Sequence, residues 1–168
     1  MFKKMKTKDY ILYSVIILSG ILLDQLTKLL AVKFLKEIDT LPIIKDVLHL
    51  TYLENRGMAL GLLENHRWIF ISVSTVTIAA LLVFVFGGFS QKKLYTVPLS
   101  LIISGGIGNM IDRLALGYVI DFIDFRLIDF YVFNGADSFV CVGAALLVIV
   151  LLRDVIEESK KEKSGKSE

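Results

Sequence analysis

The sequence has few of the residues on which most protease and redox chemistry depends. It contains one cysteine, Cys141, and two histidines, His49 and His66, among 168 residues. One cysteine cannot form an internal disulfide, and apolar surroundings disfavour its reactive thiolate, so we expect Cys141 to be a small packing residue. Neither a His-Glu-x-x-His zinc motif nor a Gly-x-Ser-x-Gly nucleophile elbow occurs. The carboxylates therefore remain as the candidates for chemistry.

Charged residues are scarce in four long segments. The chain is 55% hydrophobic, with a mean hydropathy of +0.67, whereas a typical soluble domain is about 45–50% apolar. A helix that spans a bilayer needs about 20 mostly apolar residues. The sequence therefore predicts an all-α membrane bundle of four transmembrane helices, at about residues 10–30, 68–86, 94–111 and 137–154.

The basic residues outside these segments predict the orientation of the bundle. Lysines and arginines gather in the N-terminal tail, at residues 92–93 and after residue 152, whereas the other two connecting segments are neutral or acidic. By the positive-inside rule, both termini are then cytoplasmic. We expect residues 1–156 to form one membrane domain and residues 157–168 a charged cytoplasmic tail without regular structure. The net charge of +2 indicates nothing about partners, and the sequence has no basic stripe that would suggest binding to nucleic acid.

The two segments expected on the outer side of the membrane have the composition of short strands. Residues 47–54, 117–122 and 128–133 are rich in β-branched and aromatic residues, with turn-forming or charged residues between them. Strands on the membrane face would pair their backbone groups with one another, which short bare loops cannot do. The sequence therefore predicts a small β platform on the outer face of the bundle.

Polar side chains recur with helical spacing inside the predicted spans. Asp24 and Lys28 are four residues apart, in the order that favours an ion pair; a lysine that extends to the membrane surface is the alternative. The third span has a ridge of small residues, which lets another helix approach, and beside it a polar stripe that faces the bundle. The ridge consists of Ser100, Ser104 and Gly108, and the stripe of Gly105, Asn109, Asp112 and Arg113. The stripe either contacts a substrate or joins helices by hydrogen bonds.

Two aspartates, Asp121 and Asp137, lie between the last two apolar segments. A carboxylate at the centre of a membrane helix costs about 2.5–3.5 kcal/mol, so acids in such a place favour a functional hypothesis. Two carboxylates around one water would share a proton and titrate as a unit. We expect Asp137, near the start of the last helix, to act first as the base and Asp121 as the acid. The structural alternative for Asp137 is a helix N-cap.

Five short motifs follow one another along the chain: Asp24-Gln25-Leu26-Thr27-Lys28, Asn55-Arg56-Gly57-Met58-Ala59, Gly105-Gly106-Ile107-Gly108-Asn109-Met110-Ile111-Asp112-Arg113, Val119-Ile120-Asp121-Phe122 and Phe133-Asn134-Gly135-Ala136-Asp137. Together with four spans in 168 residues, they closely resemble bacterial lipoprotein signal peptidase, the type II signal peptidase. One motif alone is weak evidence, whereas five in register are strong. Two residues depart from the family pattern: Leu60, where an aromatic is common, and Tyr131, where proline is common.

The resemblance implies an activity and a site. Members of the family remove the signal peptide from prolipoproteins, cutting before a cysteine that carries diacylglycerol, near the outer face of the bacterial cytoplasmic (inner) membrane. The resemblance further implies that Asp121 and Asp137 are catalytic and that neither a metal nor another cofactor takes part. The positions implied to bind substrate or shape the site are Asp24, Lys28, Asn55, Gly57, Asn109, Asp112, Arg113, Asn134 and Ala136. It also implies contact with membrane lipid, inhibition by globomycin, and a short surface helix or lid around residues 60–66.

Two other functions are weighed on the same residues. Asp112, Asp121 and Asp124 form an acidic group that loosely resembles the magnesium site of phosphatidyl-group transferases. The spacing differs, however, and that function gives Asp137 and Asn134 no role. A small membrane transporter with a relay of acids is the non-enzymatic alternative, but it explains the two outer segments poorly.

Overall fold

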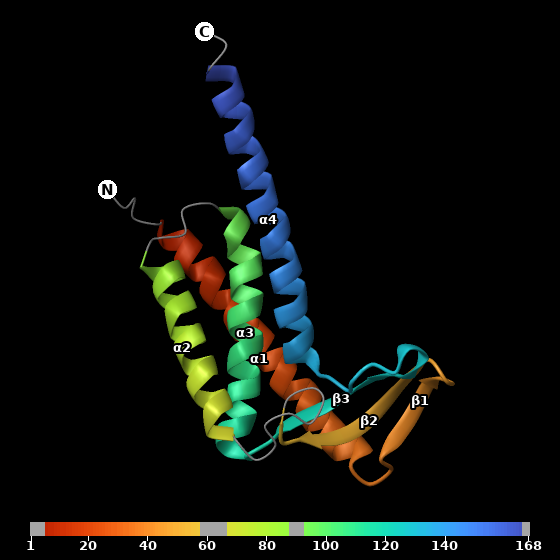
Figure 1. Cartoon of the computed structure of the whole chain (residues 1–168). Coiled ribbons are helices and arrows are strands. Elements are labelled where there is room, and N and C mark those ends of the chain that lie inside the picture. The colour runs from red at the N-terminus through yellow and green to blue at the C-terminus, as the bar shows by residue number, and fades with distance from the viewer. Residues whose placement is uncertain (1–5, 58–66, 88–92, 166–168) are drawn as a thin grey trace.

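The protein is a helical bundle with a small sheet at one end (Figure 1). The computed structural model describes residues 6–57, 67–87 and 93–165. Its long helices are α1 (Thr7–Leu35), α2 (Arg67–Phe86), α3 (Thr96–Ala115) and α4 (Gly135–Gly165). All four are long and apolar enough to cross a membrane, which confirms the prediction of four such helices.

The helix α3 packs against each of the other three helices. The predicted ridge of small residues explains this closeness, because Ser100 and Ser104 are fully buried. A Cβ atom on Gly20 of α1 would lie 2.5 Å from Oγ of Ser104, and one on Gly143 of α4 would lie 2.8 Å from the carbonyl oxygen of Pro98. Small residues therefore allow the helix backbones to approach at these contacts.

Three strands form an antiparallel sheet in the order β1 (Thr40–Ile44), β2 (Leu48–Asn55) and β3 (Val119–Phe125). Figure 1 shows that the sheet projects to one side of the bundle, at the end where α4 begins. Two of the predicted strands are confirmed, in β2 and β3. The strand β1 was not predicted, because Thr40–Ile44 contains Pro42 and shows no alternation of apolar and polar residues; proline is tolerated there because β1 is an edge strand.

The sheet is attached to the end of α1 by apolar side chains. Ile120 of β3 packs with Ala31 and Leu35 in the last turns of α1. Side chains alternate between the two faces of a strand, so the next residue, Asp121, points to the opposite face. The packing of Ile120 thus leaves the Asp121 carboxylate on the other face of β3, where it contacts Asn134 just before α4.

Three expectations need correction. Residues 128–133 are not a strand: β3 continues to Phe125, a 3-10 turn follows at Arg126–Ile128, and Asp129 has a left-handed backbone (φ 46°) that interrupts an extended chain. The tail beyond residue 156 is helical to Gly165, since its lysines and glutamates are good helix formers. Cys141 is exposed on α4 and so is not a packing residue. The expected lid at residues 60–66 lies outside the described residues.

Candidate active site

One residue, Asn134, contacts both members of the aspartate pair. Its side-chain Nδ2 donates a hydrogen bond to Oδ1 of Asp121 at 2.6 Å, and its backbone N–H donates to Oδ2 of Asp137 at 3.2 Å. Asn134 and Asp121 are almost completely buried. The sequence shows only that the two aspartates lie in the same segment. In the structure, one carboxylate on β3 and one on α4 contact the same residue.

The same asparagine caps the last helix. Its Oδ1 accepts a hydrogen bond from the backbone N–H of Asp137 at 2.9 Å, while Asp137 accepts from the backbone of Asn134. This reciprocal pattern is a capping box, in which Asn134 is the N-cap and Asp137 the third helical residue. The N-cap alternative for Asp137 is therefore wrong. Its carboxylate instead lies in the first turn of α4, where the helix dipole favours negative charge.

Amide side chains bind the remaining carboxylate oxygens of the pair. Asn55 of β2 donates from Nδ2 to Oδ2 of Asp121, and Asn109 of α3 donates from Nδ2 to Oδ1 of Asp137, each at 2.7 Å. The buried backbone N–H of Gly57 in turn donates to Oδ1 of Asn55 at 3.0 Å, which fixes the orientation of the amide. Neutral donors therefore orient both acids without supplying a positive charge of their own.

The electrostatics of the pair favour one retained proton. Burial raises the pKa of the Asp121 carboxyl to about 7; the hydrogen bond from Asn55 opposes this shift, and the negative charge of Asp137 adds to it. Near neutral pH, a large fraction of Asp121 is then protonated, unlike an ordinary aspartate with a pKa of about 3.9.

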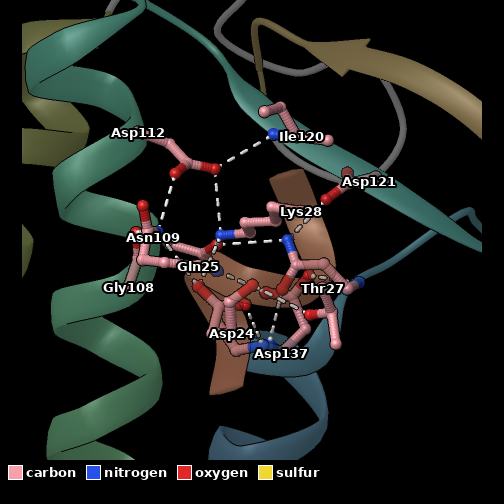
Figure 2. Close-up of polar contacts among 12 residues, drawn as sticks. Asp24, Gln25, Thr27, Lys28, Gly108, Asn109, Asp112, Ile120, Asp121 and Asp137 are labelled. Atoms are coloured by element: carbon pink, nitrogen blue, oxygen red, sulfur yellow. Dashed lines mark hydrogen bonds and ion pairs between the residues drawn. The ribbon is translucent and has the colours of Figure 1, made fainter. Parts of the chain in front are cut away.

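A buried lysine forms a second layer of polar contacts beside the pair (Figure 2). The ammonium of Lys28 lies 2.9 Å from Oδ2 of Asp24, 2.9 Å from Oδ2 of Asp112 and 2.8 Å from Oδ1 of Asn109. These three acceptors match the three N–H donors of an ammonium group. The predicted Asp24–Lys28 ion pair is confirmed, and the alternative of a lysine reaching the membrane surface is wrong, because Lys28 is buried.

This lysine cluster holds the two backbone segments that carry the aspartates. Oδ1 of Asp24 accepts a hydrogen bond from the backbone N–H of Ala136, next to Asp137, at 2.8 Å. Oδ2 of Asp112 accepts from the backbone N–H of Ile120, next to Asp121, at 3.1 Å. The acids that bind Lys28 therefore also fix the first turn of α4 and the start of β3.

Two residues close to the site have contacts that the sequence analysis did not assign. Gln25 donates from Nε2 to Oδ1 of Asp112 at 3.0 Å and to the carbonyl oxygen of Gly108 at 3.2 Å. A Cβ atom on Gly108 would collide with Oδ2 of Asp24, so glycine is required at this helix contact. Gln25 lies within a recognised motif, but spacing alone gave no signal for its role. The second residue, Phe70, lies under the guanidinium of Arg113, which is 5.0 Å from the ring centre.

The acids required by the magnesium alternative have separate partners. Asp112 binds Lys28, and Asp121 binds two asparagines. Asp124 accepts from Oγ1 of Thr51 at 2.7 Å and from Nε of Arg126 at 2.9 Å. Burial raises the pKa of Asp124, but these two bonds outweigh it and leave the pKa below its usual value. Within the described part of the chain, these carboxylates do not gather into a group that could hold a metal ion.

Comparison with known proteins shows the family of the chain. The family model described as signal peptidase (SPase) II matches residues 16–153. The lipoprotein signal peptidase of Clostridioides difficile is 49% identical over 146 residues, which cover 84% of this chain and 95% of that protein. The corresponding protein of Halothermothrix orenii is 46% identical over 137 residues, covering 82% and 92%.

Two solved bacterial membrane enzyme structures have the same fold. They superpose with TM-scores of 0.77 and 0.78, at 30% and 32% identity. Each match covers 92% of this chain, and they cover 94% and 99% of the matched chains. The chain belongs to the signal peptidase II family.

Proposed function

We propose that the protein is an aspartic endopeptidase that removes signal peptides from prolipoproteins, with Asp121 and Asp137 as its catalytic pair. Membership of the family supplies the substrate class and the reaction, hydrolysis of a peptide bond in a membrane-bound precursor. The observation that carries the assignment of residues is the contact of Asn134 with both carboxylates. The raised pKa of Asp121 supports the division of roles.

The proposed reaction proceeds through one water molecule and no covalent intermediate. The ionised Asp137 takes a proton from the water, whose oxygen attacks the scissile carbonyl carbon, while the protonated Asp121 donates its proton to the carbonyl oxygen. The tetrahedral diol then collapses: the carbon–nitrogen bond breaks, Asp137 gives its proton to the leaving amine, and Asp121 recovers one from the diol. Both aspartates end in their starting protonation states.

The membrane and the surrounding polar residues position the substrate in this proposal. A diacylglyceryl group in the bilayer holds the bond before the modified cysteine at a fixed depth, which reduces the freedom lost on binding. Asn109 and Arg113 supply donors to the extended peptide or the lipid, and Lys28 shapes the site. We further propose that both termini are cytoplasmic, that the site lies near the outer face of the cytoplasmic membrane, and that globomycin-type inhibitors occupy the same site.

The lipid dependence of cleavage tests this function. Purified protein in lipid nanodiscs should cut a diacylglyceryl-modified prolipoprotein before the modified cysteine. The unmodified precursor should be cut at about a tenth of that rate or lower, because no lipid anchor positions its scissile bond. Mass spectrometry of the products identifies the cut. EDTA should leave the cleavage rate unchanged, whereas a magnesium-dependent enzyme would lose its activity when EDTA removes the metal. Equal rates on both precursors would contradict the proposed substrate.

The activity should fall as the pH rises through about 7, because Asp121 then loses the proton that it donates. Replacing Asn55 with alanine removes a donor that favours the carboxylate, so the pKa of Asp121 should rise further. The alkaline limb of the kcat/KM profile should then move to higher pH in Asn55→Ala, whatever happens to the maximal rate. Profiles of both proteins measure this shift; a limb that stays in place or moves to lower pH contradicts the acid role of Asp121.

A further inference from the structure

The guanidinium of Arg113 stacks on an aromatic ring from a different helix. Arg113 is in the last turn of α3, and Phe70 is in the first turn of α2. The guanidinium carbon lies 5.0 Å from the centre of the Phe70 ring, within the range of a cation–π contact. Both side chains are half-buried, and partial removal of water strengthens such a contact.

This stacking is the outermost contact of a regular seam between the two helices. Thr75 of α2 donates from Oγ1 to the sulfur of Met110 at 3.5 Å, and Ile78 lies against Gly106, where a Cβ would be 3.2 Å away. Residue numbers rise along α2 while those of their partners fall along α3, as in any antiparallel helix pair. The packing of α2 on α3 therefore fixes the position of Phe70, whose ring lies against the guanidinium of Arg113.

Arg113 lies in the electrostatic field of the candidate active site. Its charge interacts with the carboxylates of Asp137, Asp121 and Asp112. Among the residues that the structure describes, none forms a hydrogen bond or an ion pair with its guanidinium, whose described side-chain contact is the ring of Phe70. A guanidinium carries five N–H donors in one plane and no acceptor. With one face on the ring, its edge remains available to oxygen atoms of a bound molecule.

We propose that Phe70 is a positioning residue, which holds the guanidinium of Arg113 so that its N–H groups bind an acceptor oxygen of the prolipoprotein beside the aspartate pair. The inference rests on the proposed function, because it requires the aspartates to be the place where substrate is cut. The acceptor is a peptide or ester carbonyl oxygen, since arginine donates only. The helix α2, whose buried residues in the described part of the chain are Ile78 and Val85, thereby contributes to substrate binding.

A double-mutant cycle separates positioning from packing. Arg113→Ala should raise KM for the diacylglyceryl-modified precursor, and Phe70→Leu should raise it roughly threefold to tenfold with kcat little changed, the size expected for a lost cation–π contact. Phe70→Tyr keeps the ring and should restore the wild-type KM. In the Arg113→Ala background, Phe70→Leu should have no further effect, because the group that it positions is gone. Ile69→Ala, at a neighbouring exposed residue, is the matched control and should leave KM unchanged.

The possible outcomes distinguish the inference from the function on which it rests. A Phe70→Leu variant with wild-type KM, or one whose effect is as large without Arg113, overturns the positioning role. Wild-type kinetics of Arg113→Ala would contradict the proposed role of Arg113 as well. Neither the Phe70 result nor the Arg113 result would bear on the proposal that the two aspartates are catalytic. Should Arg113→Ala prove too slow to measure, Arg113→Gln serves in the cycle, because a neutral amide makes no cation–π contact with the ring. Loss of cleavage in the two aspartate variants is the separate test of the function.

Discussion

Asp121→Asn and Asp137→Asn should each lower kcat by about a thousandfold or more, with the protein still folded. Each change removes one proton-transfer group, and general acid–base catalysis by a single group contributes roughly 10²–10⁴ in rate. An amide is nearly the same size as a carboxyl, but it cannot exchange protons. Because the two acids act on one water, the double variant should be scarcely slower than either single variant. Single-turnover cleavage of the modified precursor measures all three rates.

A third acid on the same strand is the control for this prediction. Asp124 is 8% exposed and, like Asp121, lies in β3, but its partners are Thr51 and Arg126. Asp124→Asn should therefore keep kcat within about threefold of wild type, since no proton is transferred through it. If Asp121→Asn retained a tenth of the wild-type rate, the aspartate pair would not be the catalytic centre. The same conclusion would follow if Asp124→Asn were as slow as Asp121→Asn.

The helical part of the fold could be predicted because the membrane restricts the choice. A span needs about 20 apolar residues and internal hydrogen bonds, so length and hydropathy alone locate α1 to α4. The sheet was harder to predict, because its edges depend on local backbone conformation. Asp129 interrupts the expected strand with a left-handed conformation, and β1 is held by its pairing with β2 rather than by its own pattern.

The residues of the candidate site could be proposed from the sequence, but the contacts between them could not. Asp121, Asp137 and Asn134 follow from the motifs, yet the sequence does not reveal that the asparagine both caps α4 and binds the other aspartate. Gln25 and Phe70 were missed for a similar reason. Their contacts depend on which residues of α3 lie opposite them, and the spacing within one helix carries no information about its neighbour.

Lys28→Met should destabilise the protein by about 3–5 kcal/mol, because it leaves two carboxylates buried without their counter-ion. Lys28 is 1% exposed, and both of its ion pairs are buried. The free energy of unfolding in detergent micelles measures the loss. Lys36→Met is the matched control: Lys36 pairs with Glu54 at 3.6 Å through a side chain that is 54% exposed, and a surface pair contributes only about 0–1 kcal/mol. Similar losses in both variants would contradict the prediction.

A second substitution should partly restore the stability that Lys28→Met removes. The cluster of Asp24, Lys28 and Asp112 carries one net negative charge when all three are ionised, and Lys28→Met leaves two. Adding Asp24→Asn returns the net charge to one while keeping an oxygen that can accept from the backbone N–H of Ala136. If uncompensated charge causes the loss, the double variant is more stable than Lys28→Met alone. If lost packing causes it, Asp24→Asn lowers the stability further, because it removes another favourable contact and relieves no repulsion.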